Sequence, residues 1–128
     1  MDTATDNKKS ISIQAADNIR MLSAAMVEKA KSGHPGGPMG GADFMHILYS
    51  EFLQYDPADM AWPLRDRFFL DAGHMSAMLY ATQTLLGNYT LEDIQNFRQW
   101  GSPTPGHPEV DVQRGIENTS GPLGLGHA

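Results

Sequence analysis

Glycine and proline gather in three stretches of this chain, and they constrain where regular structure can form. The clusters lie at residues 33–41, 101–108 and 121–126. Each predicts a loop, because proline cannot continue a helix and glycine weakens one. The regular elements are therefore expected between the clusters. The 128 residues suffice for one domain or part of one.

Apolar residues recur at helical spacing in several segments, which predicts the main helices. The expected helices cover 10–32, about 42–53 and about 74–86. A shorter helix is expected from Thr90 to about Trp100, because Thr90 and Asp93 resemble a capping box. The small, polar residues 1–9 are expected to form a flexible N-terminus.

A short apolar run at 68–70 predicts the one clear strand. It lies between charged residues and Asp71-Ala72-Gly73, as is typical of a strand buried on both faces of a parallel sheet. With the helix after it, this run would form a βα unit. Since one strand cannot make a sheet, the sequence predicts an α/β fold, mostly helices plus one clear strand, whose sheet is incomplete in this chain. Arg65, Asp66 and Arg67, which precede the run, are expected to form ion pairs or to be solvated strand ends.

Composition excludes several function classes. The chain has 9 basic and 15 acidic residues and a formal net charge of −6, which argues against a nucleic-acid partner. It has no cysteine, so disulfides and thiolate metal sites are excluded. No apolar run approaches the roughly 18 residues of a membrane span. We therefore expect a cytoplasmic protein with neither a nucleic-acid nor a membrane partner.

Four of the five histidines directly follow a glycine, at His34, His74, His107 and His127. A glycine allows close backbone approach to a ligand, and an imidazole can donate a hydrogen bond or exchange a proton near neutral pH. A single loop histidine is more often a packing or capping residue, so the recurrence carries the argument. It predicts a site for a phosphorylated, hydroxylated molecule. His46 lacks a preceding glycine and is expected to be structural.

The remaining sequence features do not define a function by themselves. No short histidine spacing typical of zinc sites occurs, and the glycine loop at 121–126 has neither the pattern nor the lysine of a P-loop. Arg98 is polar and close to the second loop cluster, and its role stays open. The sequence patterns alone therefore leave the ligand and the reaction undefined.

Six motifs, taken in order, resemble the N-terminal part of transketolases. The match runs from about Ile11 to Gly126. The motifs are Ser-Gly-His-Pro-Gly-Gly-Pro-Met-Gly at 32–40, Arg-Asp-Arg-Phe at 65–68, Gly-His at 73–74, Phe-Arg-Gln at 97–99, Thr-Pro-Gly-His-Pro-Glu at 104–109 and Gly-Pro-Leu-Gly at 121–124. Residues 10–128 are accordingly identified as a partial N-terminal thiamine diphosphate domain.

The resemblance implies a thiamine diphosphate enzyme that transfers a two-carbon ketol unit from a ketose phosphate to an aldose phosphate. It implies that His34 hydrogen-bonds the substrate near the reacting carbonyl. It also implies that His107 contacts the donor's terminal hydroxyl, which makes His34 and His107 the catalytic candidates. The cofactor-binding residues that it implies are His74, Gly121, Pro122 and Leu123.

Two departures from the family pattern qualify this expectation. Leu125 stands where the family usually has glutamine. The Gly-Asp-Gly and asparagine that hold Mg²⁺ in the family, and its activating glutamate, do not occur in this sequence and are expected beyond residue 128. The chain alone is therefore expected to be inactive. The full-length enzyme is expected to be a homodimer, and this piece to associate with the remainder of its polypeptide or a second subunit. The alternative is a short, non-catalytic binding or regulatory module that keeps the loops.

Overall fold

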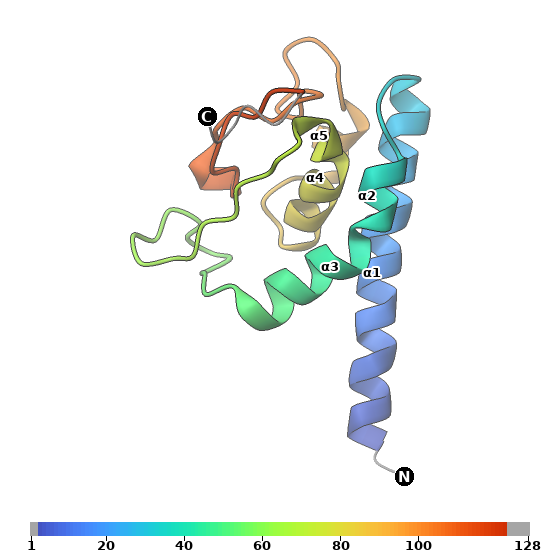
Figure 1. Cartoon of the computed structure of the whole chain (residues 1–128), viewed down its shortest axis with the longest axis vertical. Coiled ribbons are helices and arrows are strands. Elements are labelled where there is room, and N and C mark those ends of the chain that lie inside the picture. The colour runs from blue at the N-terminus through green and yellow to red at the C-terminus, as the bar shows by residue number, and fades with distance from the viewer. Residues whose placement is uncertain (1–2, 123–128) are drawn as a thin grey trace.

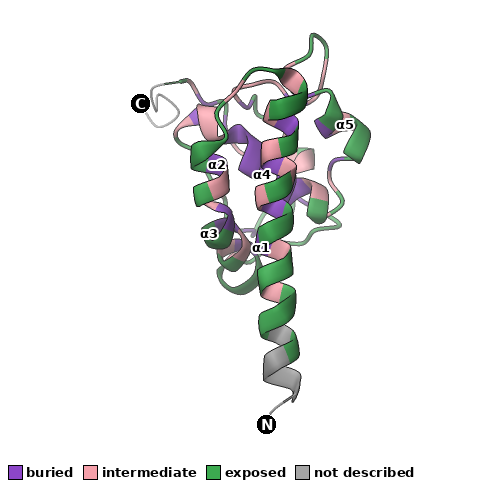
Figure 2. Ribbon diagram, turned by 90° about the vertical axis from the view of Figure 1, so that its right-hand side faces the viewer, coloured by how far each residue is buried: buried purple, intermediate pink, exposed green. Residues whose placement is uncertain are grey.

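The computed structural model describes residues 3–122, and its longest element is helix α1, Thr3–Ala30. The helix begins within the segment expected to be flexible. Its N-terminal half extends away from the rest of the molecule (Figures 1 and 2). The C-terminal half packs on the core through side chains at helical spacing. These are Ala16, Ile19, Ser23 and Met26.

Two short helices follow α1. The first, α2 (Gly36–Gly40), forms inside a cluster expected to be a loop. It tolerates Pro38 because backbone N–H groups in the first turn have no partner within a helix. The second, α3 (Ala42–Ile47), continues into a π-helical turn, η1 (Leu48–Phe52), and together they form the helix expected at about 42–53. α3 packs on α1.

Helix α4, Ser76–Leu85, forms the centre of the molecule. A 3₁₀ turn, η2 (Gly73–Met75), precedes it, so the helix expected at about 74–86 is confirmed. Every residue from Ser76 to Gln83 is buried. α4 packs on α1, α3 and the short helix α5 (Figure 1). The chain leaves α4 at Gly87, whose φ is 91°.

Helix α5, Leu91–Gln95, is shorter than expected. Its predicted capping box is confirmed: the Thr90 hydroxyl accepts from Asp93 N–H, and the Asp93 carboxylate accepts from Thr90 N–H. Residues 96–100 form turns instead of helix. A last 3₁₀ turn, η3 (Val112–Arg114), interrupts the irregular segment that follows.

The strand expected at 68–70 is absent, and residues 3–122 contain no strand, only isolated bridges. Leu70 N–H donates to Asn118 Oδ1 (3.0 Å), and Asn118 Nδ2 donates to Leu70 O (3.2 Å). A side-chain amide thus satisfies the two backbone groups that a neighbouring strand would pair. The rest of the fold prediction holds, because the described chain is mostly helical.

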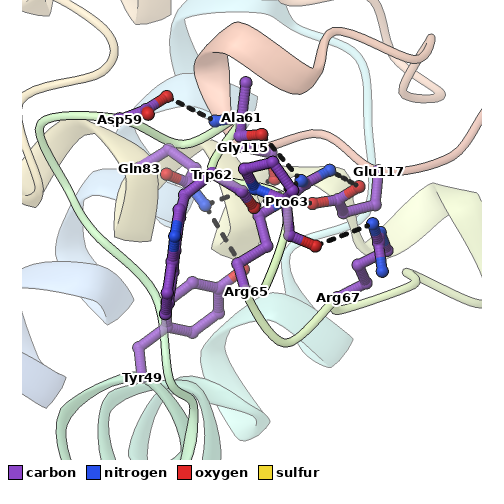
Figure 3. A network of polar contacts seen from close by, with 10 residues as sticks. All are labelled: Tyr49, Asp59, Ala61, Trp62, Pro63, Arg65, Arg67, Gln83, Gly115 and Glu117. Atoms are coloured by element: carbon purple, nitrogen blue, oxygen red, sulfur yellow. Dashed lines mark hydrogen bonds and ion pairs between the residues drawn. The ribbon is translucent and has the colours of Figure 1, made fainter.

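A network of polar contacts joins segments that are far apart in the sequence (Figure 3). The Arg65 guanidinium donates to both carboxylate oxygens of Glu117, from Nε (2.5 Å) and Nη2 (2.9 Å), and both side chains are buried. Arg65 Nη1 also donates to the carbonyls of Ala61 and Trp62. Of the two alternatives expected for Arg65, the structure shows the ion pair. Within residues 3–122, no helix is both long and apolar enough to cross a membrane.

Candidate functional site

Two of the glycine-preceded histidines lie against each other. His34 comes from the loop between α1 and α2, and His74 lies in the 3₁₀ turn before α4. Their ring centroids are 5.0 Å apart and their planes meet at 68°. His34 is exposed and His74 is half-buried. The fold thus brings together two imidazoles that are 40 positions apart in the sequence.

Gly73 is the point at which three segments meet. Its N–H donates to Gly121 O (3.2 Å). A Cβ at this position would lie 2.8 Å from Ser120 O and 3.1 Å from His107 Cδ2. Real Cβ atoms essentially never come within 3.0 Å of another atom, so the contact with Ser120 O leaves room only for glycine between the His107 loop and the 120–121 segment. The glycine before His74 therefore allows contact within the chain itself.

Side chains of α4 hold the loop that carries His107. Ser76 Oγ donates to Gly106 O (2.7 Å), and Tyr80 Oη donates to Pro105 O (2.8 Å). Ser76 and Tyr80 are four residues apart, so they lie on the same face of the helix. This support could not be predicted from the sequence, because it depends on the tertiary contact between α4 and the loop.

His107 has an electrostatic environment that favours its neutral form. Burial lowers the pKa of His107 below its ordinary value, and the nearby charges of Arg98, His34 and His74 lower that pKa further. Its Nε2 is buried without a hydrogen-bond partner, as is the hydroxyl of Ser120. An unpaired buried polar group costs about 1–3 kcal/mol. A ligand with hydroxyl or phosphate groups would offer these atoms the partners they lack.

The structure therefore gathers most of the predicted site residues. His34, His74, His107 and Gly121 lie in one cluster, and Pro122 follows at its exposed edge. His46, which the sequence analysis left out of the site, lies on α3. The remaining predicted positions, Leu123, Leu125 and His127, lie outside the described residues. Sequence reasoning missed Ser120, which joins the cluster through its backbone carbonyl next to Gly73.

A metal centre is not built by the part of the chain that the structure describes. Within residues 3–122, no group of three or more histidine, aspartate or glutamate side chains is arranged to hold a metal ion. The imidazoles of the cluster are better suited to hydrogen bonding and proton exchange near neutral pH.

A family model described as "Transketolase, thiamine diphosphate binding domain" matches residues 11–128. Among curated relatives, a transketolase from Halalkalibacterium halodurans is 53% identical over 115 residues, which cover 89% of this chain and 17% of the relative. Transketolase-1, chloroplastic, from Arabidopsis thaliana is 51% identical over 130 residues, covering 100% of this chain and 17% of the relative. The chain thus spans less than a fifth of the length of these relatives.

Solved structures give the same result. A transketolase from Pichia stipitis in complex with sedoheptulose-7-phosphate superposes with a TM-score of 0.82 and 43% identity, covering 92% of this chain and 18% of that one. A transketolase from Campylobacter jejuni superposes with a TM-score of 0.81 and 45% identity, covering 91% of this chain and 18% of that one.

Proposed function

Because the chain belongs to the transketolase family, as an N-terminal part of its thiamine diphosphate binding domain, we propose that it forms one side of a ketol-transfer active site. The reaction would move a two-carbon ketol unit from a ketose phosphate to an aldose phosphate. The observation that carries the proposal is the convergence of His34, His74 and His107, with His107 Nε2 buried and unpaired. The complex of the Pichia relative with a sugar phosphate supports this substrate class.

The residues present are compatible with the cofactor. The cluster offers two buried polar atoms without partners, Ser120 Oγ and His107 Nε2, beside the backbone of Gly73 and Gly121. Thiamine diphosphate, when bound, would supply the electron sink for cleaving the ketose carbon–carbon bond. His74, Gly121, Pro122 and Leu123 are the residues that we assign to its binding.

The two catalytic candidates would handle hydroxyl groups and protons. A neutral imidazole can accept a proton from one hydroxyl or donate one to it, so His107 Nε2 would hydrogen-bond the terminal hydroxyl of the donor sugar. His34 is exposed beside His74, where it would hydrogen-bond a substrate oxygen near the reacting carbonyl. Hydrogen-bond donors placed in this way stabilise an oxygen on which negative charge develops.

The proposal extends to features of the whole enzyme. We include Mg²⁺ bound with the diphosphate, with ligands beyond residue 128, a homodimeric assembly and a cytoplasmic location. The absence of a metal-binding cluster from residues 3–122 is compatible with ligands elsewhere in the polypeptide.

A chimera tests the proposal. Residues 11–128 would replace the corresponding segment of the Halalkalibacterium transketolase, and ketol transfer would be measured by steady-state kinetics. We expect an active chimera in which His34→Ala, His74→Ala and His107→Ala each lower kcat/KM by about 10²-fold or more. His46→Ala, outside the cluster, serves as the matched control and should change kcat/KM less than about twofold. Three histidine variants as active as the control would refute the assignment.

A further inference from the structure

Arg98 adopts a backbone conformation that is unfavourable for a residue with a side chain. Its φ is 62°, in the left-handed region, which costs a residue other than glycine roughly 1–2 kcal/mol. Its N–H donates to Thr104 O (3.0 Å), which ties it to the loop that leads to His107. Arg98 lies three residues after the end of α5, and its side chain contacts the site loops.

The guanidinium contacts both histidine loops. Arg98 Nη1 donates to the hydroxyl of Ser32 (3.1 Å), two residues before His34. A Cβ on Gly106 would lie 2.7 Å from Arg98 Nε and 2.9 Å from Cζ, so the guanidinium lies directly against this glycine. A Cβ on Gly33 would lie 3.5 Å from Arg98 Nε. Arg98 therefore spans the glycines that precede His34 and His107.

The neighbouring Phe97 packs against both Arg98 and the His34 loop. Phe97 is buried, and Arg98 Cζ lies 5.7 Å from the centroid of its ring. A Cβ on Gly33 would lie 3.3 Å from Phe97 Cε1, so Phe97 also touches the His34 loop. Arg98 is thereby held by its own backbone, by an aromatic ring and by a hydroxyl. Its Nε is buried without a partner of its own.

We propose that Arg98 is a positioning residue, which locks the Ser32–His34 loop and the Gly106–His107 loop into the arrangement that brings their imidazoles together. The proposal rests on the proposed function and adds to it a residue whose role the sequence left open. Arg98 acts through the two histidines, and its positive charge also opposes protonation of His107. Among residues 3–122, the other titratable groups whose charge acts on His107 are His34, from the α1–α2 loop, and His74, from the turn before α4.

The test is an NMR titration of the histidine side chains of this chain, without cofactor or substrate. In Arg98→Met, one positive charge is lost, so the pKa of His107 should rise towards its ordinary value while staying below it because of burial. The resonances of His34 and His107 should both shift, because the two loops lose their common contact. Arg98→Lys should keep the His107 pKa near that of the wild type, yet still shift the His34 resonances.

Arg114→Met is the matched control, because it removes the same charge from an arginine that lies over Tyr89 instead. It should leave the His107 titration unchanged. A folded Arg98→Met variant with wild-type His34 and His107 signals would overturn the proposal. If Arg98→Met does not fold, Ser32→Ala provides the second variant, because it removes the hydroxyl that Arg98 contacts. Wild-type His34 resonances in Ser32→Ala would show that this contact does not position the His34 loop, and would overturn the proposal. Because no cofactor is present, the titration can fail without affecting the proposed function.

Discussion

Gly73 occupies a position at which any side chain would displace the site. Its missing Cβ leaves room for the carbonyls of Ser120 and Gly121 and for the ring of His107, all within 3.1 Å of where that atom would be. The two shortest of these approaches are to backbone atoms, which cannot swing away as the end of a flexible side chain can. One glycine thus determines how closely three segments of the site can pack.

We expect Gly73→Ala to destabilise the chain by about 1–3 kcal/mol, the usual cost of overpacking a filled position. It should also shift the NMR signals of His107 and Ser120. Urea denaturation and a heteronuclear NMR spectrum would measure both effects. Gly40→Ala is the control, because a Cβ there meets nothing within 4 Å and alanine favours helix α2. Equal stability of the two variants would contradict the packing argument.

The sequence allowed the histidines to be identified, but not the contacts that bring them together. The glycine before each of His34, His74 and His107 is visible in the sequence and predicted a shared site. The left-handed φ of Arg98 and the two hydrogen bonds from α4 to the His107 loop depend on tertiary packing, which leaves no periodic signal. Ser120 was missed for the same reason.

Among the elements, α5 is the one whose start could be predicted from chemistry. The reciprocal hydrogen bonds of Thr90 and Asp93 satisfy two N–H groups that the first turn leaves unpaired. The end of α5 could not be predicted, because contacts with other segments determine the conformation of residues 96–100, and these contacts leave no helical periodicity in the sequence. The run at 68–70 failed as a strand for a related reason: apolar character indicates burial, and here the partner is a side chain, Asn118.

Removal of the cap tests how strongly α5 supports the site. Thr90→Ala should lower the free energy of unfolding by about 1 kcal/mol, whereas Thr90→Ser, which keeps the hydroxyl oxygen, should cost much less. Because Phe97 and Arg98 follow α5, amide hydrogen exchange at these residues should also accelerate in Thr90→Ala. If both variants unfold at the same urea concentration as the wild type, the capping box contributes nothing measurable.

At the scale of the whole molecule, contacts between residues about 50 positions apart in the sequence hold distant segments together. Arg65 pairs with Glu117, and Leu70 pairs through both backbone groups with the Asn118 side chain. These ties hold the 115–121 segment against the 61–70 segment. The 115–121 segment ends at Gly121, and the 61–70 segment leads to Gly73-His74. The contacts that stabilise the fold therefore also position these two parts of the site.

Asn118→Ala should therefore affect stability and the site together. It leaves the buried N–H and C=O of Leu70 unpaired, at about 1–3 kcal/mol for each group, so urea denaturation should show a lower free energy of unfolding. The Leu70 amide should exchange faster, and the His74 resonances should shift, because the chain from Leu70 to His74 loses its anchor. Gln113→Ala, at an exposed position in η3, is the control and should alter none of these. A loss of stability with unchanged His74 signals would mean that the 68–70 segment holds the fold but does not position the site.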